Sequence, residues 1–310
     1  MDCREIKGVA SAAISSLLDG PAAPAELIGS YPVAVYLRTA GRVIALVGPE
    51  AVRLPNAIAL SGADFALVVR QASTSALHVG NGGVQVGPVR VVAARWWDPV
   101  PRLGRVDAVF LAGRLDALRA ILPAWPDPAD PAADRLRTGR EALASVLAGT
   151  GDLARTVRRL VGLGAGLTPA GDDLLAGAMA GLVVFGTALE RPDATALAGR
   201  MRREVVGQAR ATTPLAADLA EHAARGALVQ PAAELCRVIA DPQPSAENDL
   251  APALERLLRI GHTSGRDLVE GLLLGASTAT HSSSGGWPGW PRSGGGRGSP
   301  GGIRRRRVAE

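Results

Sequence analysis

Hydrophobic residues change their spacing along the chain near Gly104, and this change divides the predicted structure in two. Before Gly104, short apolar runs are separated by turn residues, which is typical of β-hairpins. The turns leave little room for crossover helices, so we expect a small antiparallel sheet or barrel rather than a parallel sheet. The predicted strands are Val33–Arg38, Val43–Val47, Phe65–Arg70, Leu77–Val79, Val84–Val86 and Val89–Arg95.

After Gly104 the apolar residues recur every three or four positions, which predicts amphipathic helices. The fold class is therefore α+β: a β-rich N-terminal domain over 1–103 is followed by a mostly α-helical domain over 104–281. The predicted helices are Arg114–Leu122, Ala132–Ala148, Asp152–Val161, Pro169–Leu189, Asp193–Ala211, Pro214–Arg225, Pro231–Ala240, Leu250–Ile260 and Gly265–Thr280.

The last segment, 282–310, has a different composition from the rest. It is rich in glycine, proline and arginine, so we expect a disordered basic tail, and one hypothesis for its origin is a frameshift near codon 281. The segment holds six of the 34 basic residues and one of the 29 acidic ones, which leaves 28 of each in positions 1–281. Because the body is neutral, a nucleic-acid partner is not expected.

Membrane insertion and disulfide bonding are also not expected. The longest apolar run, Leu174–Leu189, is shorter than a bilayer crossing and holds three glycines, so a buried core helix is the better interpretation. Cys3 and Cys236 are too few for a disulfide framework, and the N-terminus lacks a signal-peptide pattern. We therefore expect a cytoplasmic protein without a membrane partner.

Two of the predicted helices begin with related sequences. Gly171–Gly181 and Gly265–Gly275 both read Gly-x-Asp-Leu-(Leu/Val)-x-Gly-x-x-x-Gly, 94 residues apart. Residues four apart share a helix face, so each aspartate, Asp173 or Asp267, continues a stripe of glycines. Glycine costs a helix interior about 1 kcal/mol against alanine, so the stripes predict a close backbone contact, and one candidate is a contact between these two helices.

The starts of these helices favour anions. Thr168 is a predicted N-cap with Pro169 at the first helical position, and the glycines before it allow a tight turn with free N–H groups. Gly261–Gly265 offers the same arrangement plus the imidazole of His262. The predicted anion-binding residues are Gly164, Gly166, Thr168, Gly171, Asp172, Thr263, Ser264 and Gly265.

Simpler interpretations remain open for each of these features. Thr-Pro is ordinary helix capping, and Asp172 at a helix start complements the helix dipole without any ligand. We expect His78 on a strand face, His222 on the surface or in packing, and Thr212–Pro214 as a structural helix start, unless it faces the same cavity. The sequence contains neither a Cys/His zinc-site spacing nor a Walker-type loop.

The motifs resemble those of a bacterial family that includes the third subunit of oxamate carbamoyltransferase. The family's Gly-Leu-Gly-Pro-Gly-Leu-Thr-Pro-Ser-Gly-Asp-Asp is similar to residues 162–173, with Ala165 and Ala170 in place of proline and serine. Its Gly-His-Thr-Ser-Gly is identical to residues 261–265, and the segment of Thr212–Pro214 and His222 is also similar. The resemblance covers most of 25–280.

The resemblance implies carbamoyl transfer between oxalurate or oxamate and phosphate, in allantoin catabolism. It implies carbamoyl phosphate and oxamate as ligands and other subunits of a hetero-oligomeric enzyme as partners. His262, Asp173 and Asp267 are then the candidate catalytic residues, with His262 as proton relay. Asp173 and Asp267 either orient the amide or hold a divalent cation such as Mg²⁺ with Thr168; Asp172 is another candidate metal ligand. The alternatives are a non-catalytic structural or regulatory subunit and a protein that binds small anionic metabolites.

Overall fold

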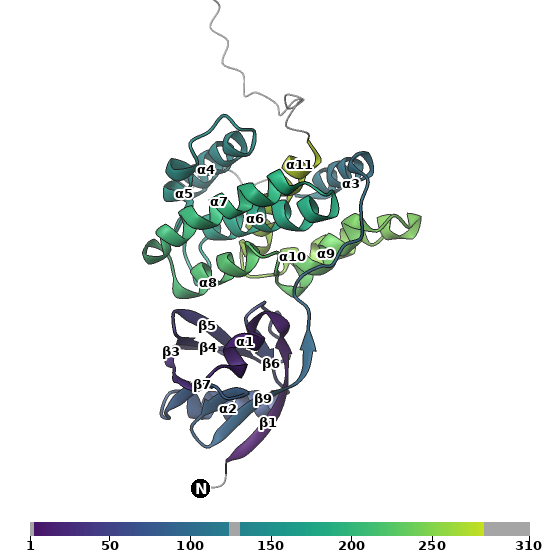
Figure 1. The fold of residues 1–310 in the computed structure, drawn as a ribbon. Coiled ribbons are helices and arrows are strands. Elements are labelled where there is room, and N and C mark those ends of the chain that lie inside the picture. The colour runs from purple at the N-terminus through teal and green to yellow at the C-terminus, as the bar shows by residue number, and fades with distance from the viewer. Residues whose placement is uncertain (1–2, 124–130, 282–310) are drawn as a thin grey trace, which may run out of the picture.

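The chain folds as a β-rich unit followed by a helical unit, which lie at opposite ends of the molecule in Figure 1. This computed structural model describes residues 3–123 and 131–281. The α+β fold class expected from the hydrophobic spacing is confirmed. The predicted basic tail, 282–310, lies outside the described residues.

One mixed sheet forms the N-terminal unit. In the described part of the chain it has nine strands in the order β2-β7-β8-β9-β1-β6-β5-β4-β3. Two short helices, α1 (Ser15–Asp19) and α2 (Gly62–Ala72), contribute Leu18 and Phe65 to its core. The strands are β1 (Arg4–Ser11), β2 (Ala23–Pro24), β3 (Glu26–Ser30), β4 (Ala34–Thr39), β5 (Arg42–Val47), β6 (Ala57–Ala59), β7 (Leu77–Gly80), β8 (Gly83–Val86) and β9 (Val89–Trp97).

The two edges of the sheet meet, which gives it a barrel-like form. The edge strands β2 and β3 are consecutive in the chain and are separated only by Ala25. Thr39 Oγ1 on β4 also donates a hydrogen bond to Pro24 O on β2 at 3.0 Å. The chain at Ala25 and this hydrogen bond thus bring the two edges of the curled sheet together, although β2 and β3 form no ladder with each other.

The structure corrects two predictions about this unit. Phe65–Arg70 lies within α2 rather than in a strand, because the Ser61 side chain caps a helix there by accepting from Asp64 N, and Phe65 and Val68 face the core. The sheet is also not purely antiparallel. Strand β1 pairs with β9 in parallel, with the other strands of the unit between them in the chain, and β5 pairs with β6 in parallel through the loop of residues 48–56. The hairpins β4–β5 and β7–β8 are confirmed.

The helical unit follows the predicted helices closely, with its longest helix, α6, at the centre. By length and composition α6 could cross a membrane, but 78% of its apolar window is buried inside the protein, as expected for a core helix. The longer helices are α3 (Ala108–Ile121), α4 (Pro131–Leu147), α5 (Leu153–Leu160), α6 (Ala170–Ala188), α7 (Pro192–Gly207), α8 (Pro214–Ala223), α9 (Gln230–Ala240), α10 (Leu250–Leu258) and α11 (Ser264–Thr280).

Helices α6 and α11 pack against each other through the predicted glycine stripes. A Cβ added at Gly177 would overlap Leu268 O, and one added at Gly271 would overlap Leu174 O. The partners 268 and 174 are again 94 residues apart, so the two helices are related by an approximate two-fold axis. Gly181 faces Leu272 and Ala276, further along α11, which shows that the helices run parallel and begin at the same end.

Each of these helices also begins against the carbonyl end of a preceding helix. A Cβ on Gly171, in the first turn of α6, would overlap Leu160 O at the end of α5. Likewise, a Cβ on Gly265, in the first turn of α11, would overlap Leu257 O near the end of α10. The repeated unit is therefore a pair of helices joined by a loop, α5–α6 and α10–α11, rather than a single helix start.

We predict that Gly177→Ala lowers the free energy of unfolding by about 3 kcal/mol, because the added methyl group meets backbone that cannot rotate away. The matched control is Gly199→Ala in α7, where a Cβ meets nothing within 4 Å. That change should stabilise by roughly 0.5–1 kcal/mol through helix propensity alone. Urea unfolding of the two variants measures the difference, and equal effects would contradict the close contact.

Candidate functional site

The parallel packing of α6 and α11 brings the two predicted motifs together at one end of the helix pair. The clearest contact is between side chains that precede and open the helices: Thr168 Oγ1 lies 3.0 Å from Ser264 Oγ. Both hydroxyls are partly buried. Residues that are 96 positions apart in the chain thus form one group.

Helix α6 begins one residue later than the sequence predicted. Its N-cap is Pro169 rather than Thr168, and no side chain caps it. The Thr168 hydroxyl lies against Ser264 and also acts on Asp173, whose pKa it lowers, instead of capping a backbone N–H of the first turn. Thr263 is likewise the N-cap of α11 without a capping hydrogen bond from its side chain. These threonines are better placed for contacts across the site than for capping.

Asp173 and Asp267 form the acidic part of this group. Asp267 is fully buried and Asp173 partly buried. No described donor makes a hydrogen bond of ordinary geometry to either oxygen of Asp267 or to Asp173 Oδ2. The hydroxyls of Thr263 for Asp267, and of Ser264 and Thr168 for Asp173, nevertheless lie near enough to lower the pKa of these carboxyls. Burial raises the pKa of Asp267 to about 6, and the Thr263 hydroxyl and Arg266 offset part of this increase. Burial also raises the pKa of Asp173 well above its usual value, and the carboxyl of Asp267 adds to the increase.

Asp172 has a different role from its neighbour. Its Oδ2 accepts hydrogen bonds from Gly162 N at 2.9 Å and from Thr212 Oγ1 at 2.8 Å. These bonds join the loop before α6 to the start of α8, so Asp172 braces the loop from inside. Burial nevertheless raises its pKa, because desolvation outweighs the two hydrogen bonds. Asp172, which the sequence predicted as an anion-site residue or metal ligand, thus uses its Oδ2 to hold the loop, whereas its Oδ1 has no hydrogen-bond partner among the described residues.

The loop between α5 and α6 exposes backbone N–H groups to solvent. Gly162, Gly164 and Gly166 all have positive φ, at 72°, 118° and 95°, which side-chain-bearing residues rarely adopt. Residues 164–166 are exposed, and the amides of 164–168 donate no hydrogen bond to other described residues. Concave loops with such free amides bind anions. His262 and Thr263 lie in the exposed turn before α11.

The segment Thr212–Pro214 faces this loop, as the sequence analysis left open. Besides the bond from Thr212 to Asp172, Thr213 Oγ1 donates to Leu167 O at 2.5 Å and accepts from Ala216 N at 3.0 Å. Thr213 is therefore both the N-cap of α8 and a tether of the loop. The start of α8 fixes the backbone just before Thr168.

A second polar cluster, which the sequence analysis missed, joins α8 to the barrel-like unit. Asp218 is buried, and its carboxylate accepts from Arg42 Nε at 2.5 Å and from Asn56 Nδ2 at 2.9 Å. His222 Nε2 lies 2.9 Å from Arg42 Nη2 and 3.4 Å from Asp218 Oδ2. His222 is thus a buried packing residue, one of its two predicted settings. The available signal was the four-residue spacing of Asp218 and His222 on one helix face.

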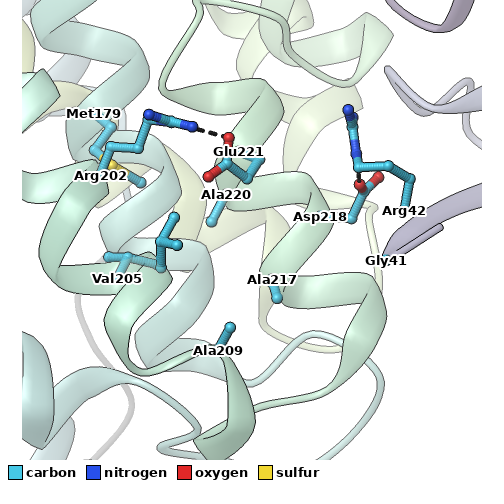
Figure 2. Close-up of a pocket in the computed structure, with 11 residues that line it drawn as sticks. Gly41, Arg42, Met179, Arg202, Val205, Ala209, Ala217, Asp218, Ala220 and Glu221 are labelled. Atoms are coloured by element: carbon cyan, nitrogen blue, oxygen red, sulfur yellow. Dashed lines mark hydrogen bonds and ion pairs between the residues drawn. The ribbon is translucent and has the colours of Figure 1, made fainter. Parts of the chain in front are cut away.

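The turn between β4 and β5 places Arg42 in this cluster. Ala40 and Gly41 have φ of 47° and 75°, as the tightest hairpin turns require, and Arg42 follows directly. A cavity of about 250 Å³ lies beside it, bounded by α7, α8 and this turn. Figure 2 shows Arg202 paired with Glu221 on one side of α8 and Arg42 paired with Asp218 on the other. The residues at the α6–α11 end do not line this cavity.

We predict that Asp218→Asn destabilises the protein near neutral pH. Burial raises the pKa of Asp218, but the bonds from His222 and Arg42 outweigh it and leave the pKa below its ordinary value. A lowered pKa in the folded state contributes stability above the unfolded pKa, and this contribution is lost as the pH falls through the folded value. The variant should therefore lose about 2 kcal/mol at pH 7 and progressively less below about pH 4.

Urea unfolding over this pH range provides the measurement. Asp116→Asn is the matched control, since Asp116 pairs with Arg119 on the surface of α3 and should contribute little. A loss at Asp218 that stays constant down to pH 3 would contradict the role of its charge.

Comparison with known proteins identifies the part of the chain that carries both motifs. Residues 160–276 match the model of a family described as oxamate carbamoyltransferase subunit AllH. The match covers over a third of the chain and runs from the end of α5 through most of α11. No curated protein and no solved structure matches the chain. The family predicted from the motifs is confirmed for this segment.

Proposed function

We propose that this chain, whose residues 160–276 match the family of oxamate carbamoyltransferase subunit AllH, acts in carbamoyl transfer through the common end of α6 and α11. The observation that carries the proposal is the meeting of the two motifs. Thr168 and Ser264 lie in contact, and the buried carboxyl of Asp267 and the partly buried carboxyl of Asp173 lie beside them. A site assembled from two distant motifs is typical of ligand binding rather than of helix capping.

The proposed reaction exchanges a carbamoyl group between phosphate and the nitrogen of oxamate. In one direction a phosphate oxygen attacks the carbamoyl carbon of oxalurate, the C–N bond breaks, and the oxamate nitrogen takes up a proton. Both ligands carry negative charge, which suits the free amides of 164–168 and the positive ends of two helices. His262 supplies the proton, supported by its exposed position beside Thr263.

The same proposal includes the setting of the protein. Membership in a subunit family supports a hetero-oligomeric enzyme with other subunits. We place the reaction in allantoin catabolism and in the cytoplasm. The two cysteines, Cys3 and Cys236, are free, as is usual in a reducing compartment. The alternative of a non-catalytic subunit makes a different prediction for ligand binding by the chain alone.

We predict that His262→Ala lowers the rate of carbamoyl transfer by the full assembly about a hundred-fold, because a positioned acid–base group contributes at this level. Asp173→Asn should lower it about ten-fold or more. His78→Ala on β7 is the matched control for loss of an imidazole and should leave the rate unchanged. Wild-type rates in both site variants would exclude the proposed roles.

A second measurement separates a substrate-binding chain from a purely structural subunit. Carbamoyl phosphate or oxamate should raise the melting temperature of the isolated chain, by an amount that grows with the ratio of ligand concentration to Kd. The shift should disappear in Asp173→Asn. No shift with either compound would favour the non-catalytic alternative.

A further inference from the structure

The carboxyls of Asp173 and Asp267 have bonding capacity that the described residues do not use. Three of their four oxygens, Asp173 Oδ2 and both oxygens of Asp267, are buried without a hydrogen-bond partner in the described chain. Buried carboxyl oxygens are costly to leave unpaired. The two groups lie at equivalent positions of the two-fold pair α6–α11, one turn before the contacting glycines Gly177 and Gly271, and the charge of Asp267 acts on Asp173.

The surrounding charges do not balance this pair. Asp172 and Glu270 add two more carboxyls, whereas Arg266 and Arg140 supply the positive charge nearby. Glu270 lies 3.1 Å from Arg140 and 3.8 Å from Arg266, and Arg266 also donates to Pro123 O at 2.6 Å. The charge of Arg266 also acts on Asp267, whose pKa it lowers, so the group as a whole has four carboxyls and two guanidinium groups.

We infer that Asp173 and Asp267 together bind a divalent cation of the Mg²⁺ type. The atoms grouped at this point are all oxygens: the two carboxyls and the hydroxyls of Thr168, Thr263 and Ser264. Such a set suits Mg²⁺ or Mn²⁺ and does not suit metals that require nitrogen or sulfur ligands. The hydroxyls are only partly buried or exposed, so the site is reachable from solvent.

A cation accounts for the pair better than an amide ligand does. An amide N–H₂ group is neutral, so it can donate to the carboxyl oxygens but does not favour their ionised form. A divalent cation favours the ionised form of both carboxyls. The described chain shows no cluster of three or more His, Cys, Asp or Glu side chains suited to a metal. The proposed site therefore rests on two carboxylates, and Mg²⁺ is commonly held by one or two while water and phosphate oxygens complete its shell.

The cation also gives the proposed function a more specific form. Where the ligand is carbamoyl phosphate, a phosphate held by the loop amides of 164–168 would lie next to the cation and share it. This part of the inference rests on the proposed function. The binding of the cation by the chain itself does not.

The test is a Mn²⁺ titration of the isolated full chain after treatment with EDTA, followed by electron paramagnetic resonance of the free ion. We expect one Mn²⁺ per chain, displaced by excess Mg²⁺. Asp267→Asn and Asp173→Asn should each weaken binding at least about ten-fold. Asp116→Asn on α3 is the matched control and should bind like the wild type. Repeating the titration with inorganic phosphate should tighten binding to the wild type.

Circular dichroism establishes that each variant is folded, and Thr168→Val serves as a milder third variant, with weaker binding expected. The inference is overturned if the wild type binds no Mn²⁺ at millimolar concentration, or if both aspartate variants bind as tightly as the wild type. Mn²⁺ binding without carbamoyl transfer would remove the proposed function and leave the cation site. Carbamoyl transfer without Mn²⁺ binding would remove the cation site and leave the proposed function.

Discussion

The close backbone contact between α6 and α11 is the constraint on which the rest of the helical unit depends. Gly177 and Gly271 each face a carbonyl of the other helix, at a separation that leaves no room for a side chain. Because the helices run parallel and in register, their first turns lie at the same end. This contact brings the carboxyls of Asp173 and Asp267 to the same end of the helix pair, where the loop amides of 164–168 and His262 also lie.

Helix α8 connects this site to the barrel-like unit. Its N-terminal threonines hold the loop before α6, through Leu167 O and Asp172, while Asp218 one turn later is held by Arg42 and Asn56 of the sheet. The β-rich unit is therefore connected to the site through α8, although none of its residues lies in the site. A buried charged cluster gives such a junction a defined geometry, because displacing α8 would leave Asp218 unpaired.

Much of the site was predictable from the sequence because its key features are local patterns. The repeated Gly-x-Asp spacing predicted a glycine-lined contact, and the structure has that contact in the predicted register. The capping role of Thr168 was wrong because a single hydroxyl has several partners within reach, and the choice of Ser264 depends on a residue 96 positions away. Asp218 was missed for the same reason, since its partners lie on strands of the other unit.

The fold was predicted well where spacing is periodic and less well where tertiary context decides. The long helices keep a regular apolar face, so their positions followed directly from the sequence. Phe65–Arg70 is apolar on both faces in the manner of a strand, and only the cap at Ser61 shows that the chain turns into a helix there. The parallel pair β1–β9 arises from long-range topology, and the parallel pair β5–β6 from the path of the loop 48–56; hydrophobic spacing encodes neither.

The central claim is that two segments far apart in sequence form one site, and a cysteine cross-link tests it most directly. Thr168→Cys and Ser264→Cys, introduced together with Cys3 replaced by serine, place two thiols where hydroxyl oxygens lie 3.0 Å apart. Mild oxidation should give a disulfide between these positions, detected by mass spectrometry of the peptides, whereas Thr168→Cys with Ser277→Cys should give none. Two thiols at 168 and 264 that stay free under oxidation and react independently with alkylating reagents would contradict the account.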